Sequence, residues 1–175
     1  MRGKLAVLAI LAAAAAAGAG LYYLEQFHWY DVTEVGAATL PLATPDGGTT
    51  QIAVTGLVIA EGASSPLKYR ACFRAEEGAE AVAERAARHP DPVPTTAPRN
   101  FPCFSADAIA SALAREEALA FDSGAGTPYG IDRVVAIGAD GTGFAWHQIN
   151  PCGAAVFDGD PPPPGCPPPP DRYTE

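Results

Sequence analysis

The chain has 175 residues, with 11 basic and 20 acidic side chains and a net charge of −9. Nine basic and all 20 acidic residues follow Lys4, so this part carries a net charge of −11. Such an acidic surface repels phosphate backbones and argues against nucleic-acid binding. The roughly 150 residues after the apolar N-terminal stretch are enough for one domain with an ordinary hydrophobic core.

The N-terminal stretch, residues 5–24, begins at Leu5, ends at Leu24 and contains no charged residue. At about 1.5 Å per residue, a helix of this length spans the roughly 30 Å core of a bilayer. Basic residues precede it and acidic residues dominate after it. The positive-inside rule therefore predicts a transmembrane signal-anchor helix within residues 1–24, with a cytoplasmic N-terminus and a periplasmic remainder.

Two other interpretations of this stretch remain open. A cleaved secretory signal would use the small residues around positions 15–19 as its cleavage site. The apolar run continues to Leu24, and aromatic residues follow it, which favours an uncleaved anchor. The third interpretation is the buried core helix of a cytosolic protein.

The cysteines support export of residues 25–175. There are four, at Cys72, Cys103, Cys152 and Cys166. An even number in an exported domain predicts two disulfides, for which three connectivities are possible. The local pairs Cys72–Cys103 and Cys152–Cys166 are favoured, and each would stabilise the fold by about 3 kcal/mol. Neither a CxxC motif nor zinc-ligand spacing is present.

Residues 25–35 are predicted to be a juxtamembrane segment, and residues 36–160 a periplasmic domain. Alternating apolar residues at 38–43 and 51–54, around a Pro/Asp/Gly turn, predict a hairpin. Residues 67–74 alternate strictly and predict a third strand.

The middle of the chain predicts two helices. Residues 76–88 have helical spacing, with an acidic first turn and basic residues near the end. Five prolines make residues 90–102 an extended loop. Ser105 is a suitable N-cap for a helix over 106–116, and 118–121 is interpreted as a short strand.

The clearest hairpin joins residues 131–137 to 144–150, and 156–157 would add an edge strand. Residues 161–175 form a proline-rich tail. The order of elements predicts an α+β fold: a transmembrane helix, then one domain with a largely antiparallel sheet and two helices against one of its faces.

Candidates for catalysis are few. His147 is the best candidate for a general base, and Asp132 for a nearby acid. A histidine satisfied by neighbours within the sheet is the favoured interpretation of His147. Asp132 and Arg133 are adjacent on one predicted strand and point to opposite faces, so they cannot form one site. Either one could pair with a residue of the neighbouring strand.

No cofactor or metal is expected from the sequence. The histidines lack ligand spacing, the aspartates lack calcium-loop spacing, and the chain has neither a phosphate-binding nor a dinucleotide-binding motif.

Several stretches together resemble a family of uncharacterised small anchored membrane proteins from alphaproteobacteria. They are SSPLKYRACF, FPCF, YGIDRVVAI, GFAWHQINPCG and GCPP. The resemblance implies a single N-terminal membrane helix and four cysteines, but no activity, ligand or catalytic residue.

Two functions follow as hypotheses. The first is a non-enzymatic domain, anchored in the bacterial inner membrane through residues 5–24, that binds or supports an envelope protein partner. The alternative is a hydrolase-like envelope enzyme that uses His147 with a nearby acid.

Overall fold

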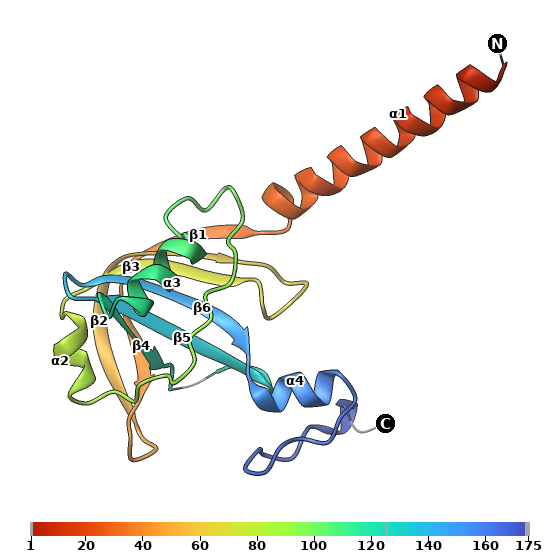
Figure 1. The fold of residues 1–175 in the computed structure, drawn as a ribbon. Coiled ribbons are helices and arrows are strands. Elements are labelled where there is room, and N and C mark those ends of the chain that lie inside the picture. The colour runs from red at the N-terminus through yellow and green to blue at the C-terminus, as the bar shows by residue number, and fades with distance from the viewer. Residues whose placement is uncertain (1, 125, 174–175) are drawn as a thin grey trace.

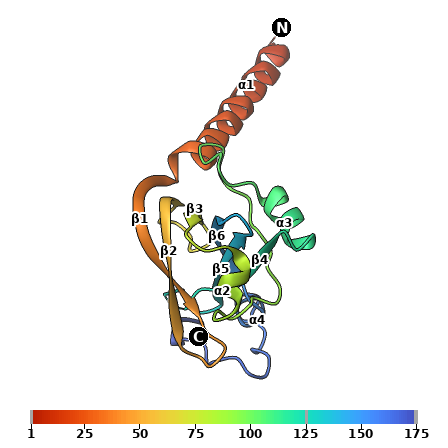
Figure 2. The same cartoon turned by 90° about the vertical axis from the view of Figure 1, so that its left-hand side faces the viewer.

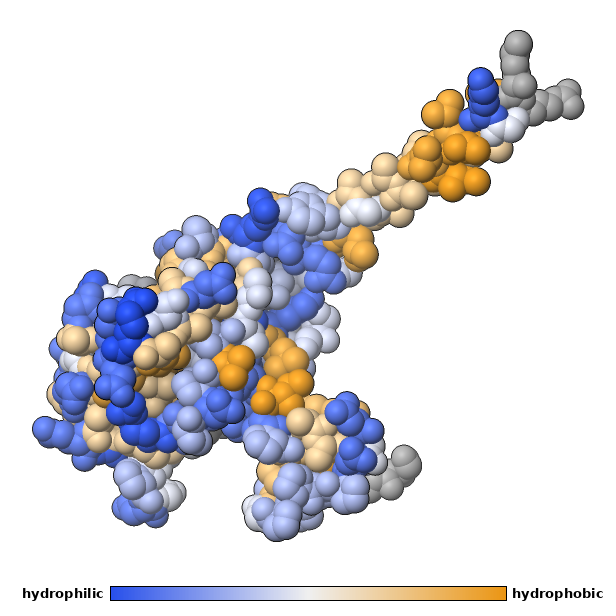
Figure 3. All heavy atoms as spheres, viewed as in Figure 1, coloured by the Kyte–Doolittle hydropathy of each residue, from blue (hydrophilic) through white to orange (hydrophobic). Residues whose placement is uncertain are grey.

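An isolated apolar helix, α1 (Arg2–Tyr23), leads into the rest of the protein in the computed structural model, which describes residues 2–124 and 126–173 (Figure 1). The segment Gly3–His28 is long and apolar enough to cross a membrane, a property that signal sequences share. No residue of its most apolar 18-residue window is buried, and Figure 3 shows apolar residues along the visible face of α1. A π-helical turn, η1 (Leu24–His28), ends the helix.

Six antiparallel strands follow, in the order β1-β2-β3-β6-β5-β4 across one sheet. Their bounds are β1 Asp31–Ala43, β2 Thr49–Glu61, β3 Tyr69–Ala75, β4 Ala118–Asp122, β5 Ile131–Gly138 and β6 Thr142–Ile149. The α+β class and the antiparallel sheet predicted from the sequence are confirmed.

The first strand is longer than the apolar pattern indicated. β1 begins at Asp31, inside the segment predicted to be juxtamembrane, and pairs with β2 along its whole length. The register shifts around Gly36, whose φ is +82°. The outer half of β1 is exposed on both faces, so it shows no apolar alternation from which a strand could be predicted.

The sheet carries a hydrophobic cluster on each face. On one face α2 (Ala79–Ala83) places Val82 against residues such as Phe121 and Ile137. On the other, α3 (Ala106–Ala114) places Ile109 against a cluster that contains Trp146. The prediction that both helices cover one face is therefore wrong: they lie on opposite faces, because alternate residues of each strand supply the two clusters.

The segment after α2 joins the two edges of the sheet. Ala87 donates its backbone N–H to Ala43 at the end of β1 and accepts from Asp122 at the end of β4. His89 donates its backbone N–H to Ala120. The helix predicted over 76–88 is therefore short, since its last residues are extended and act as a link between β1 and β4. Figure 2 shows the resulting curvature of the sheet around α2.

The proline-rich segment 90–102 crosses the face that carries α3. Arg70, which is 4% exposed, holds it there by donating to the carbonyl oxygens of Thr95 and Thr96 at 2.9 and 2.8 Å. The same guanidinium donates to the carbonyls of Leu67 and Tyr69. The disulfide Cys72–Cys103 joins the end of this segment to β3.

A fourth helix, α4 (Pro151–Phe157), replaces the predicted edge strand at 156–157. The side chain of Asn150 caps it by accepting from the N–H of Gly153 at 2.9 Å, and Pro151 occupies its first turn. The second disulfide, Cys152–Cys166, ties the proline-rich tail to α4. Both disulfides are the local pairs that the sequence favours. A short 3-10 turn, η2 (Asp171–Tyr173), ends the described part of the tail.

Candidate functional site

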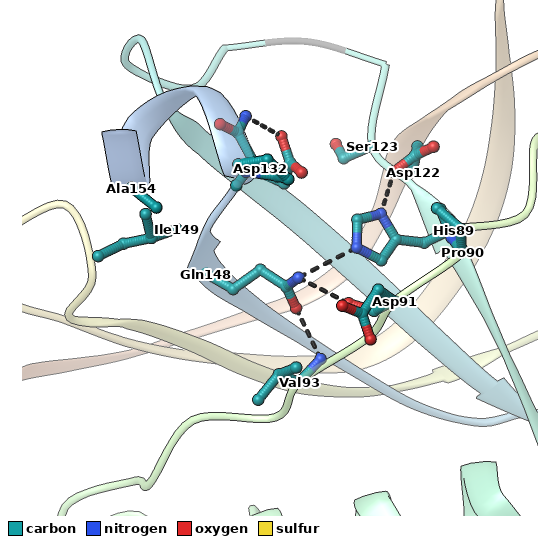
Figure 4. Close-up of a pocket in the computed structure, with 12 residues that line it drawn as sticks. His89, Pro90, Asp91, Val93, Asp122, Ser123, Asp132, Gln148, Ile149 and Ala154 are labelled. Carbon is teal, nitrogen blue, oxygen red and sulfur yellow. Dashed lines mark hydrogen bonds and ion pairs between the residues drawn. The ribbon is translucent and has the colours of Figure 1, made fainter. Parts of the chain in front are cut away.

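A cavity of about 680 Å³ lies where β5, β6, the end of β4 and the segment after α2 meet the start of α4 (Figure 4). Its lining mixes polar and apolar residues from sequence-distant parts of the chain: His89, Pro90, Asp91, Val93, Asp122, Ser123, Asp132, Gln148, Ile149, Asn150, Pro151 and Ala154. Val93 and Ile149 are 55% and 43% exposed and give its rim an apolar part. The recess between the body and the C-terminal segment is visible in Figure 3.

Strand alternation brings the central side chains together. Trp146, Gln148 and Asn150 follow one another on the same face of β6 and its end. The register of β5 and β6 places Asp132 directly opposite Gln148. Because α3 covers the inner part of this face and α4 begins at its outer end, the polar residues lie in the opening between the two helices.

Gln148 has a single possible orientation in this network. Its Oε1 accepts hydrogen bonds from the backbone N–H of Val93 at 2.8 Å and from the indole Nε1 of Trp146 at 3.1 Å. Both of these groups can only donate. The side-chain nitrogen must therefore point the other way, toward the carbonyl of Asp91 at 2.9 Å and Nε2 of His89 at 3.1 Å.

His89 is held from both ring nitrogens. Its Nδ1 lies 2.5 Å from Oδ1 of Asp122, and its Nε2 receives the hydrogen bond from Gln148. Burial disfavours the charged ring, but the hydrogen bond to Asp122 and the charges of Asp122 and Asp132 outweigh burial and raise the pKa of His89. The hydrogen bond from Gln148 acts against this rise, because it needs a lone pair on Nε2.

Three carboxylates face the cavity, and no lysine or arginine of the described chain lines it. Asp132 accepts a hydrogen bond from Nδ2 of Asn150 at 2.8 Å, and Asp122 interacts with Nδ1 of His89. The carboxylate of Asp91 has no hydrogen bond or ion pair with any described residue. The site is therefore anionic, and among the described lining residues His89 alone can offset the negative charge of the three carboxylates.

A family model described as a family of unknown function, DUF6446, matches residues 40–167. The chain belongs to this family. No curated protein and no solved structure matches the chain. The DUF6446 region includes every residue that lines the cavity and all four cysteines, but it starts after α1.

His147 lies outside this cavity, on the opposite face of the DUF6446 sheet. It is 6% exposed, stacks on Tyr69 with ring centroids 4.6 Å apart, and interacts through Nδ1 with the carbonyl of Pro66 at 2.6 Å. Its Nε2 accepts from Nε of Arg133 at 2.9 Å, a cross-strand pair. The pKa of His147 is lowered to about 4, chiefly by burial; the hydrogen bond with the Pro66 carbonyl opposes this, and the charges of Arg133 and Arg70 add to it.

The structure does not bring His147 and Asp132 together, although they were the two candidates for an acid/base pair. Asp132 points into the cavity, and His147 points away from it with both ring nitrogens occupied. Ser123, the only hydroxyl-bearing residue among the described residues of the lining, donates to the carbonyl of Pro41 and not to His89. In the described part of the chain, no group of three or more histidine, cysteine or acidic side chains could hold a metal ion.

Sequence reasoning missed the pairing of His89 with Asp122, which are 33 residues apart, and the role of Gln148. One signal was available. Asn150 followed by Pro151 is a helix-start pattern, and it predicts a helix directly after β6. This helix is α4, which forms one wall of the cavity.

Proposed function

We propose that this chain is a single-pass protein of the alphaproteobacterial inner membrane, with α1 as an uncleaved signal anchor and residues 25–175 in the periplasm. The isolated apolar helix supports this arrangement, with Arg2 and Lys4 at its N-terminal end and the acidic domain after it. The two disulfides indicate an oxidising, non-cytoplasmic compartment.

The domain acts in this proposal by binding and not by catalysis. The observation that carries it is the cavity of about 680 Å³, in which the imidazole and amide groups are already engaged with one another. A general base needs a free lone pair within reach of a substrate, and Nε2 of His89 is occupied by Gln148. The carboxylates remain the groups that are available to a ligand.

The matching ligand is a basic side chain of an envelope protein or peptide. Asp91, Asp122 and Asp132 would receive its ammonium or guanidinium group, while Val93 and Ile149 at the rim would contact its apolar stem. A lysine or arginine side chain combines these two chemistries.

The test is an NMR titration of the full chain in detergent micelles with two matched peptides. One is a tripeptide with a central lysine, and the other has norleucine, which has the same stem without the amine. We expect the lysine peptide to shift the resonances of Gln148 and Asn150, and norleucine to shift them much less. Equal binding of the two peptides would refute the charge-based function. Protease accessibility in intact spheroplasts tests the location separately.

A further inference from the structure

A second, smaller cavity of about 240 Å³ lies at the end of the membrane-crossing segment. It is lined by His28, Trp29, Asp31, Ala63 and Ser64. Its walls come from the end of η1, the start of β1 and the loop after β2. The candidate membrane span ends at His28, so this cavity opens at the depth where the helix leaves the hydrocarbon core.

Aromatic residues mark that depth as the headgroup region. Tyr22, Tyr23, Phe27 and Trp29 are all at least 38% exposed around the helix end. Tyrosine and tryptophan are enriched at this level of the bilayer, because their rings are apolar and their polar atoms reach water. An exposed Trp29 that also lines the cavity joins the cavity to the lipid surface.

Two basic side chains hold the domain body against the helix end. Lys68 lies over the rings of Trp29 and Tyr30, at 4.9 and 5.3 Å from their centroids. Arg99, on the proline-rich segment, lies 5.8 Å from the ring centroid of Tyr22, and its backbone N–H donates to Gln26. These contacts keep the loop that carries Ser64 at the same level as the end of α1.

The charged residues at and beside this cavity favour a ligand that carries both a positive and a negative group. The register places Asp31 directly opposite Glu61, and like charges at such a cross-strand position are unfavourable. Glu61 and Lys68 stand just outside the lining, at the two ends of the loop that carries Ser64. Nζ of Lys68 lies 3.9 Å from Glu25, and Ser64 itself lines the cavity. A ligand with an ammonium group would relieve the acidic pair, and its phosphate would find a lysine and a hydroxyl nearby.

We propose that this cavity binds the headgroup of a phospholipid with a primary ammonium group, of the phosphatidylethanolamine class. The ammonium lies between Asp31 and Glu61, the phosphate lies toward Lys68 and Ser64, and the acyl chains run along the exposed aromatic residues of α1. This inference rests on the membrane anchoring proposed above, but not on the ligand of the larger cavity.

The test is native mass spectrometry of the full chain released from nanodiscs of mixed phospholipids. We expect phosphatidylethanolamine to be retained in preference to phosphatidylcholine, whose methylated ammonium cannot donate hydrogen bonds. Asp31→Asn and Glu61→Gln should each weaken retention about tenfold, the size expected when one charge-assisted hydrogen bond is lost. Asp107→Asn, at an exposed position on α3, is the matched control.

Three results would overturn the proposal. They are equal retention of the two lipids, unchanged retention in both acidic-site variants, and equally strong binding of glycerophosphoethanolamine, which has the headgroup without acyl chains. The two binding proposals can fail separately, since one is measured by lipid retention and the other by the lysine-peptide titration. Asp31→Asn should leave that titration unchanged. Failure of the anchor would appear as a chain that does not enter nanodiscs at all.

Discussion

The side-chain nitrogen of Gln148 points at Nε2 of His89 from 3.1 Å, and this contact determines what the larger cavity can do. It occupies Nε2 of His89, while the other ring nitrogen, Nδ1, is already engaged by Asp122. The carboxylates around it are left as the ligand-binding groups, and this is the basis of the binding function proposed above.

Replacement of Gln148 by leucine should destabilise the domain by about 3 kcal/mol. The substitution leaves the N–H of Val93 and the indole of Trp146 without an acceptor, and each unsatisfied buried donor costs about 1–3 kcal/mol. Urea unfolding in detergent measures the change. Gln51→Leu, at an exposed position on β2, is the control and should stay close to wild type. A Gln148→Leu variant as stable as that control would contradict the described network.

His147 should make the protein sensitive to mild acid. The pKa of this histidine is about 4 in the folded state and about 6.5 in an unfolded chain. Between these values the unfolded state binds a proton that the folded state does not, so stability falls as the pH falls. We expect a loss of about 2 kcal/mol between pH 7 and pH 5.

The measurement is the free energy of unfolding at both pH values for the wild type and His147→Gln. The variant should lose this part of the pH dependence, whereas His28→Gln, at an exposed position, should keep it. An identical pH profile for the wild type and His147→Gln would show that the site of His147 is not as described.

Arg70→Lys should release the proline-rich segment from the sheet. An ammonium group cannot reach all four carbonyls that the planar guanidinium bonds, so buried acceptors lose their partners. We expect a loss of about 3 kcal/mol and faster hydrogen exchange across residues 92–100. Arg74→Lys, at an exposed position on the same strand, should change neither quantity appreciably. Unchanged exchange in Arg70→Lys would show that Arg70 does not hold this segment against the sheet.

Removal of the second disulfide should weaken ligand binding as well as stability. Cys152 lies on α4, which forms a wall of the larger cavity, and its bond to Cys166 closes a short loop. The double substitution Cys152→Ser and Cys166→Ser should cost about 3 kcal/mol of stability. Lysine-peptide titrations should show weaker binding even where the variant is folded. Full binding by a folded variant would mean that α4 is not needed at the cavity.

Local patterns in the sequence predicted most of the strands, because alternation and turn residues are properties of neighbouring positions. They missed the outer half of β1 and placed a strand at 156–157, where α4 lies. The faces of the helices were also predictable, as Val82 and Ile109 show by their burial. The side of the sheet on which each helix packs could not be predicted, because it depends on the path of the segments that connect the helices to the strands. The link from Ala87 to both edges of the sheet is a long-range contact with no local signature.

In the candidate site, too, local features were predictable and long-range contacts were not. Alternation along β6 placed Trp146, Gln148 and Asn150 on one face and His147 on the other, as the structure has them. The partner of each side chain came from elsewhere: His89 from the segment after α2 and Arg133 from β5. His147 was the candidate because it lies in a regular strand pattern. His89, which lines the cavity, precedes Pro90 in an irregular segment and gave no such pattern.

The most direct test of the central claim is the affinity of the lysine tripeptide for the wild type and for Asp132→Asn, measured by the same NMR titration with Asp107→Asn as the control. Asparagine keeps the shape of Asp132 and removes one charge from the cavity. We expect binding to weaken about tenfold in Asp132→Asn and to stay unchanged in the control. Equal affinities for the wild type and Asp132→Asn would contradict the assignment of the cavity as a site for basic side chains.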